Sequence, residues 1–271
     1  MREKNRPIGI FDSGIGGLTV VKEIIRELPN EDIVYFGDTA RLPYGNKSAR
    51  TVTRFSLENV KFLLKFNVKS IVVACNTSSS LSLPALRKKF KVPILGVVSP
   101  AVKKAVELSP GGRIGVIATA ATVGSACYQR EIKKSAGRYK SFAQACPLFV
   151  PLVEEGWTND DVTLEVARRY LGPLVKQNID TLILGCTHYP LLEKLIRKAV
   201  GERIQFVDSA KETALELKRV LAENGLKSLS RSARYKFFVS DEPERFRKAA
   251  RRFLGKIPCL NKGKFSSTIS P

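Results

Sequence analysis

The stretch TLILGCTHYPLLEKLIRKAV, residues 181–200, decides the fold class. An apolar run of strand length ends in glycine, a cysteine, a threonine and the only histidine of the chain follow, and a segment with helical spacing comes next. The stretch SIVVACNTSSSLSLPALRKKF, residues 70–90, has the same order of strand, cysteine, small polar residues and helix. A strand that leads into a helix is the repeating unit of parallel α/β proteins, so both stretches predict βα units.

The rest of the chain alternates in the same way. Strand-like apolar runs lie at 8–14, 32–38, 68–76 and 92–100, and amphipathic helical runs lie at 17–29, 49–66 and 81–90. The pattern then restarts, because RIGVIATAATV (113–123) resembles PIGIFDSGIGG (7–17). This repetition predicts an α/β fold of two related domains, each a mostly parallel sheet flanked by helices, with an active site in the cleft between them.

The last part of the chain has elements of its own. A strand at 204–210, a helix that ends at Gly225, a strand at 235–240 and a helix at 243–255 follow one another. We expect this part to pack back on the first half. The tail, 261–271, has little apolar surface to bury, and we expect it to be disordered.

Length and composition fit a globular protein of about two domains. The chain has 271 residues, 44% of them hydrophobic, its first residues do not resemble a secretory signal, and no apolar run reaches the ~18 residues of a membrane span. The five cysteines are an odd number without a C-x-x-C pair, which argues against a disulfide scaffold or a zinc finger. We therefore expect free thiols, a cytoplasmic location and no membrane partner.

The formal net charge of +21 results from 46 Lys and Arg residues against 25 Asp and Glu residues. Nucleic-acid binding would explain such a charge, but no nucleic-acid motif accompanies it. The basic residues are spread among helix-like segments, at 86–91, 130–140 and 245–256. A solvated surface, or a field that attracts an anionic small substrate, explains the charge as well. We expect a small-molecule partner rather than nucleic acid.

Polar side chains gather where the predicted strands end. In open parallel sheets, ligands bind beyond the carboxyl ends of the strands. The residues at the ends of the predicted strands are Asp12 with Ser13, Asp38, Cys75 with Asn76 and Thr77, Thr119, and Cys186 with Thr187 and His188. Such residues from both halves indicate one site between two domains. The single histidine argues against a metal site, and DSGIGG (12–17) lacks the G-x-G-x-x-G spacing of a dinucleotide site.

Two of the cysteines are candidates for proton transfer. Cys75 and Cys186 each precede a predicted helix start, and a helix N-terminus lowers the pKa of a thiol. Cys186 with His188 would also suit a nucleophile and its base, but that interpretation leaves Cys75 without a role. Equivalent positions in two related domains favour opposed acid/base groups across one cleft. The remaining cysteines are interpreted as small buried hydrophobic residues: Cys127, Cys146 and Cys259.

In sequence order, motifs from residue 8 to about 210 resemble those of the glutamate racemases, in the cofactor-independent aspartate/glutamate racemase superfamily. They are IGIFDSGIGGLTV, GDTARLPYG, VVACNTSS, GVIATAATV, CPLFVPLVEEGW, LILGCTHYPLL and VDSA, and SDEPERFRKAARRFLG extends the resemblance to about residue 255. The resemblance implies two domains, 1–98 joined by 208–271 and 99–207. It also implies interconversion of L-glutamate and D-glutamate without a cofactor, to supply peptidoglycan synthesis.

The resemblance assigns roles residue by residue. Cys75 matches the cysteine that deprotonates D-glutamate, and Cys186 matches the one that deprotonates L-glutamate. Asp12 and His188 match residues that assist the thiols, and Glu154 matches another acidic residue near the site. The positions that match substrate-binding residues are Asp12, Ser13, Tyr44, Gly45, Asn76, Thr77, Thr187 and His188.

Some features depart from the family pattern or stay open. Ser99, Ala120 and Ala126 with Cys127 differ from the usual residues, but none of them is a catalytic position. The spacing does not select glutamate over aspartate or another amino acid. A basic nucleic-acid-binding protein on the same fold is the alternative of a different class. A homodimer and activation by a cell-wall precursor are also undecided by the sequence.

Overall fold

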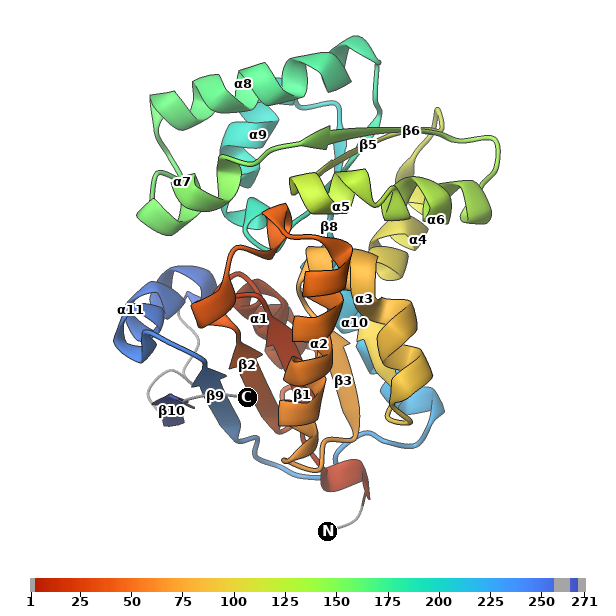
Figure 1. Cartoon of the computed structure of the whole chain (residues 1–271). Coiled ribbons are helices and arrows are strands. Elements are labelled where there is room, and N and C mark those ends of the chain that lie inside the picture. The colour runs from red at the N-terminus through yellow and green to blue at the C-terminus, as the bar shows by residue number, and fades with distance from the viewer. Residues whose placement is uncertain (1–2, 256–263, 268–271) are drawn as a thin grey trace.

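The computed structural model describes residues 3–255 and 264–267, which form two parallel β-sheets with helices on their faces (Figure 1). The first sheet has the strand order β10-β9-β2-β1-β3-β4, and the second has the order β6-β5-β7-β8. Every strand pair in both sheets is parallel. The predicted α/β class and its two related units are therefore confirmed.

The first sheet is buried on both faces. Its strands are β1 (Ile8–Asp12), β2 (Ile33–Gly37), β3 (Ser70–Val73), β4 (Ile94–Gly96), β9 (Tyr235–Val239) and β10 (Lys264–Ser267). Its helices are α1 (Leu18–Glu27), α2 (Ala49–Leu64), α3 (Asn76–Lys89), α10 (Ser209–Glu223) and α11 (Pro243–Leu254). Ile10 packs in the core with α1 and α10, whereas its neighbour Phe11 packs in the core with α2 and α3. This two-sided burial explains the continuous apolar runs of the strands.

The second sheet is built in the same way. Its strands are β5 (Arg113–Ala118), β6 (Lys140–Ala145), β7 (Thr181–Gly185) and β8 (Gln205–Asp208). Its helices are α4 (Val98–Leu108), α5 (Ala120–Gly124), α6 (Cys127–Ser135), α7 (Phe149–Glu155), α8 (Asp161–Lys176) and α9 (Glu193–Val200). Ile183 faces the core with α4 and α6, and Leu182 faces the core with α8 and α9.

The two sheets share one topology, which is the structural form of the repeat in the sequence. β2-β1-β3-β4 in the first sheet corresponds to β6-β5-β7-β8 in the second. The last part of the chain extends the first sheet, because β9 pairs with β2 and places Phe237 beside Tyr35. The domain boundaries 1–98 plus 208–271 and 99–207 stay a proposal, which this division of the strands supports.

Four element predictions are wrong in part. The run 92–100 is a strand only at Ile94–Gly96, because Val98, Ala101 and Val102 are spaced to bury one face of α4. α3 begins at Asn76 rather than at residue 81, since packing buries its serines despite their weak helix propensity. The helix-like segment 130–140 ends at Ser135, before a glycine turn. In the tail, Lys264–Ser267 forms a strand beside β9, and the rest of 261–271 lies outside the described residues.

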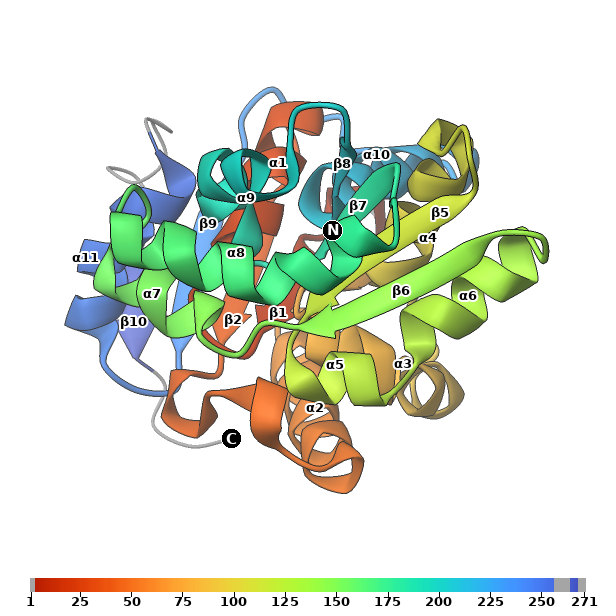
Figure 2. The same cartoon turned by 90° about the horizontal axis from the view of Figure 1, so that it is seen from above.

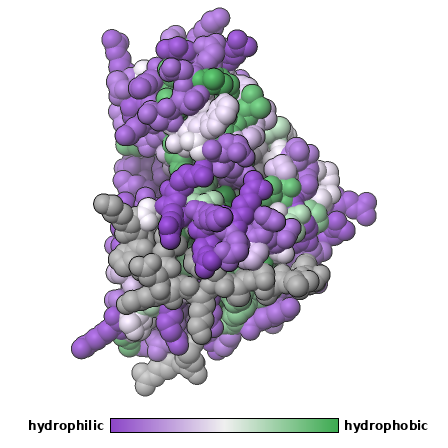
Figure 3. Space-filling view, turned by 90° about the vertical axis from the view of Figure 1, so that its left-hand side faces the viewer, coloured by the Kyte–Doolittle hydropathy of each residue, from purple (hydrophilic) through white to green (hydrophobic). Residues whose placement is uncertain are grey.

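Seen from above, α7 and α8 of the second unit lie over α11 and the edge of the first sheet (Figure 2). The face that carries α11 is mostly hydrophilic, with small separate hydrophobic areas (Figure 3). Within 3–255 and 264–267, none of the helices has the length and hydropathy needed to cross a membrane.

Candidate active site

A cavity of about 300 Å³ lies between the carboxyl ends of the two sheets. All but one of the predicted site residues line it, namely Ser13, Tyr44, Gly45, Cys75, Asn76, Thr77, Glu154, Cys186, Thr187 and His188. Asp12 is the exception, because it is fully buried and does not line the cavity. Thr119, a strand-end candidate without an assigned role, also lines the cavity, and so do Pro147 and Val150, which the sequence did not indicate.

Cys75 is the first of the two thiols in this cavity. It caps the N-terminus of α3, where its Sγ accepts a hydrogen bond from the Ser78 N–H at 3.5 Å. Its S–H donates to Ser13 Oγ at 3.6 Å. Burial raises the pKa of Cys75, the nearby Asp12 carboxylate raises it further, and the Ser78 N–H lowers it. The predicted effect of the helix end is therefore present, but burial outweighs it.

Cys186 occupies the equivalent position at the end of β7, with a different local structure. No α-helix begins at once, because a 3₁₀ turn (Tyr189–Leu192) precedes α9. Burial raises the pKa of Cys186, the backbone N–H of His188 lowers it, and negative charge on Cys75 raises it. The predicted α-helix start directly after Cys186 is therefore wrong, and the lowering of the pKa by a backbone N–H is outweighed by burial. A thiolate at Cys75 therefore opposes ionisation of Cys186.

His188 links Cys186 to Glu154. Its Nδ1 lies 4.0 Å from Cys186 Sγ, and its Nε2 lies 3.1 Å from Glu154 Oε1. When Nε2 carries a proton and donates it to this carboxylate, Nδ1 is free to accept a proton on the thiol side. Edge-to-face contact with Phe253 of α11, at 5.4 Å between ring centroids, also fixes the imidazole.

Asp12 is a buried carboxyl whose charge acts on Cys75. Its Oδ2 accepts a hydrogen bond from the Gly14 N–H at 3.0 Å, whereas its Oδ1 has no hydrogen-bond partner among the described residues. Burial raises the pKa of Asp12, and the His188 charge lowers it. The raised pKa makes the Asp12 carboxyl a better proton acceptor than an exposed aspartate. Its predicted direct contact with a substrate stays a prediction.

The loop DSGIGG meets the other half of the site rather than a nucleotide. A Cβ on Gly16 would lie 2.3 Å from Thr187 Oγ1 and 2.4 Å from His188 Nδ1. Only glycine therefore allows this loop to approach the loop after β7. The close contact explains a glycine-rich turn that matched no dinucleotide motif.

Hydroxyl and amide groups surround the space between the thiols. Asn76 Oδ1 accepts a hydrogen bond from Tyr128 at 2.6 Å, and its Nδ2 has no partner among the described residues. Thr77 Oγ1 lies 2.9 Å from Thr119 Oγ1 and 3.2 Å from Thr122 Oγ1, and so joins α3 to α5. These donors from both units suit the binding of a carboxylate.

The loop after β2 closes one side of the cavity. Tyr44 donates a short hydrogen bond to Asp38 and accepts one from Asn59 Nδ2 at 3.2 Å. Asp38 follows a strand, yet its carboxylate holds Tyr44 and does not line the cavity. A Cβ on Gly45 would lie 2.7 Å from Thr119 Cβ, so this position requires a residue without a side chain.

The geometry defines a two-unit α/β protein in which one thiol from each unit lines the same cavity. The model of the Asp/Glu/Hydantoin racemase family matches residues 8–217. The chain is 49% identical to the glutamate racemase of Geobacter metallireducens over 92% of this chain and 93% of that protein. These matches show that the chain belongs to the Asp/Glu/Hydantoin racemase family, whose racemases are isomerases.

Solved structures agree with this assignment. A glutamate racemase isoform from Bacillus anthracis has a TM-score of 0.93 and 39% sequence identity, with 99% of this chain and 98% of that chain covered. The glutamate racemase of Francisella tularensis in complex with D-glutamate has a TM-score of 0.91 and 38% identity, with the same two coverages. The fold and its two sheets are therefore those of glutamate racemases.

Proposed function

We propose that this chain interconverts L-glutamate and D-glutamate without a cofactor, by proton transfer between two thiols. The observation that carries the proposal is that Cys75 and Cys186 follow corresponding strands of two different sheets and line the same cavity. Relatives named glutamate racemases cover nearly the whole chain, which supports glutamate as the substrate.

Each turnover moves one proton off the substrate and another one onto it. In the D-to-L direction, the Cys75 thiolate takes the Cα proton of D-glutamate, and the Cys186 thiol gives its proton to the opposite face of the carbanion. Cys75 ends as the thiol and Cys186 as the thiolate, which is the state that starts the reverse reaction. Asn76, Thr77 and Thr187 are the proposed donors that stabilise charge on the substrate carboxylate.

Buried thiols need help to ionise, and the site offers two sources. Asp12 is the proposed acceptor of the Cys75 proton, and His188, held by Glu154, is the proposed acceptor of the Cys186 proton. The ammonium group of a bound amino acid also brings positive charge, which favours a thiolate. A thiol that ionises only beside its substrate avoids carrying an unpaired charge in a buried site.

Substrate choice, cellular role and location belong to the same proposal. The resemblance supports glutamate, with supply of D-glutamate for peptidoglycan in the cytoplasm. The alternative substrates are aspartate and other amino acids, because the cavity has no assigned partner for the side-chain carboxylate. A homodimer is compatible with the proposal but is not required by it.

The test is circular dichroism of purified protein with L-glutamate, D-glutamate or D-aspartate and no added cofactor. Decay of the circular dichroism signal of either glutamate enantiomer to zero supports the proposal. Turnover of aspartate alone would replace glutamate as the substrate. Absence of turnover together with tight, salt-sensitive DNA binding would instead favour the nucleic-acid alternative.

A further inference from the structure

Helix α11 of the first unit makes direct contacts with the catalytic edge of the second unit. Arg252 Nη1 donates to the backbone carbonyl of Glu154 at 3.0 Å and to that of Val153 at 3.3 Å. Both carbonyls belong to the last turn of α7, about one hundred residues earlier in the chain. These contacts therefore connect the two units beside one of the proposed proton-transfer groups.

The end of α7 is built to receive this cation. The Trp157 N–H donates to Leu152 O at 2.8 Å, and the Gly156 N–H donates to Val153 O at 3.0 Å. This pair of bonds is a Schellman motif, which leaves the Glu154 carbonyl without a partner in the helix. Gly156 has a φ of +87°, and a Cβ there would lie 2.8 Å from Arg252 Nη1. The glycine thus both ends the helix and makes room for the guanidinium.

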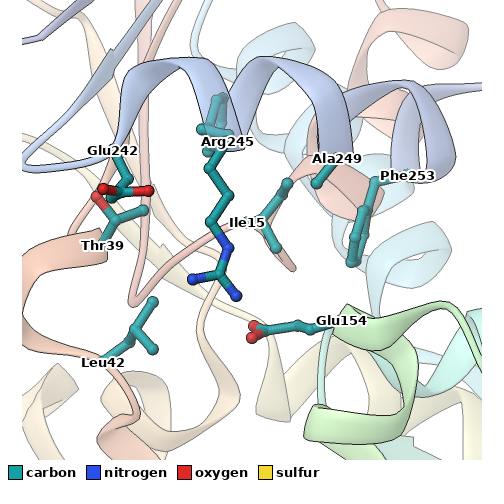
Figure 4. Close-up of a pocket in the computed structure, with 9 residues that line it drawn as sticks. Ile15, Thr39, Leu42, Glu154, Glu242, Arg245, Ala249 and Phe253 are labelled. Carbon is teal, nitrogen blue, oxygen red and sulfur yellow. The ribbon is translucent and has the colours of Figure 1, made fainter.

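Two further side chains of α11 approach the same pair of residues. Phe253, next to Arg252, places its ring edge-to-face with His188. Arg245 extends from α11 toward the Glu154 carboxylate across a separate cavity of about 140 Å³ (Figure 4). α11 therefore borders the Glu154–His188 pair through the backbone of one member and the ring of the other.

We propose that α11 is the positioning element for the Glu154–His188 pair and that Arg252 is its central positioning residue. Arg252 acts through Glu154 and does not touch the substrate. Without its two hydrogen bonds the last turn of α7 frays, Glu154 no longer holds His188, and proton transfer at Cys186 slows. Cys75 is held instead by α3 and Ser13. Loss of the Arg252 hydrogen bonds should therefore slow proton transfer at Cys186 and leave proton transfer at Cys75 unchanged. This inference rests on the proposed function, which assigns L-glutamate to Cys186.

The test has to separate the two proton transfers. The equilibrium constant of a racemisation is one, so any variant changes kcat/KM equally in both directions. Deuterium at Cα of L-glutamate instead reports abstraction by Cys186, and deuterium at Cα of D-glutamate reports abstraction by Cys75. A slower Cys186 step increases the first isotope effect and decreases the second. The measured quantity is therefore the isotope effect with L-glutamate divided by the isotope effect with D-glutamate.

For Arg252→Gln we expect a roughly five-fold loss of kcat/KM, the scale of one hydrogen bond, and a raised isotope-effect ratio. Arg252→Lys keeps a cation that can donate to the carbonyls, and it should restore most of both quantities. Arg251→Gln is the matched control, because the Arg251 side chain is exposed and makes no hydrogen bond or ion pair with residues 3–255 and 264–267. This control should behave as the unsubstituted protein.

The outcomes distinguish this inference from the proposed function. A loss of activity in Arg252→Gln with an unchanged or lowered ratio would mean that Arg252 has only a structural role, and it overturns the inference. Unchanged kinetics in Arg252→Gln overturn it as well. If the unsubstituted protein does not racemise glutamate, the proposed function and the inference both fail.

Discussion

His188 Nε2 lies 3.1 Å from Glu154 Oε1, a contact between the loop after β7 and the last turn of α7. The contact orients the imidazole so that Nδ1 faces Cys186 at 4.0 Å. Proton acceptance by His188 is thus tied to one thiol. The other thiol has Asp12 as the neighbour whose charge affects its pKa.

We expect His188→Asn to lower kcat more in one direction than in the other, with a loss of roughly 10²-fold for L-glutamate. An asparagine amide can donate and accept hydrogen bonds, but it cannot carry a transferred proton. The measurement is kcat and KM with each enantiomer. The value of kcat/KM must stay the same for the two enantiomers, so a larger fall of kcat with one of them is accompanied by a lower KM. Unsubstituted values for both enantiomers would show that the histidine is structural.

Gly45→Ala is expected to reduce kcat/KM about 10-fold or more. The new methyl group would lie 2.7 Å from Thr119 Cβ, so the loop with Tyr44 would have to leave the cavity wall. Gly124→Ala provides the control, because a Cβ there would meet no atom within 4 Å. Equal kinetics of the two variants would contradict the tight packing described for Gly45.

Asp208 is predicted to destabilise the fold at neutral pH. Burial raises its pKa from 3.8 to about 6, with a hydrogen bond from the Ala210 N–H opposing this effect. A carboxyl with a raised folded-state pKa binds more protons in the folded state, so stability falls as the pH rises from about 4 through 6. The resulting loss in the free energy of unfolding is at most roughly 3 kcal/mol.

Asp208→Asn should remove this pH-dependent loss, because an asparagine oxygen can still accept the Ala210 hydrogen bond. Urea unfolding of both proteins at pH 4 and pH 7 measures the difference. We expect the variant to be the more stable protein at pH 7 and the two free energies to converge at pH 4. A less stable variant at pH 7 would mean that the charge of Asp208 is favourable.

The sequence was sufficient for the parts of the fold and site that depend on local pattern. Buried parallel strands are continuous apolar runs, so β1, β3, β5 and β7 could be located, and the residues after them line the cavity. Asp38 shows the limit of the strand-end rule, since its carboxylate turns to Tyr44. Thr119 is the opposite case, a strand-end residue that lines the cavity but had no assigned role.

Contacts between distant segments could not be predicted in this way. The environment of Cys186 depends on a 3₁₀ turn at Tyr189–Leu192, whereas the pattern indicated an immediate helix like the one after Cys75. The contact of Arg252 with Glu154 joins residues 98 positions apart. In the sequence, Arg252 is one of several basic residues of a predicted amphipathic helix, and only the fold distinguishes it from its neighbours.

The two-thiol mechanism predicts how hydrogen isotopes move in deuterated water. With a separate base on each face, the proton taken from the substrate is not the one returned. Early product should therefore carry deuterium at Cα, while unreacted substrate keeps its hydrogen because a thiol holds the single proton it has taken. One base that served both faces would pass much of the original hydrogen to the product. Mass spectrometry of each enantiomer in the first turnovers separates these outcomes.

Alanine variants test the same mechanism independently. Cys75→Ala and Cys186→Ala should each lower racemisation by roughly 10²–10⁴-fold or more, because each removes the proposed base of one face. Cys127→Ala, Cys146→Ala and Cys259→Ala should keep nearly full turnover, although Cys146 is buried and its loss should cost some stability. Cys259 lies outside the described residues, so its variant tests the sequence-based interpretation alone. Robust racemisation by either of the first two variants, or retention of substrate hydrogen in the first product, would exclude a base on each face.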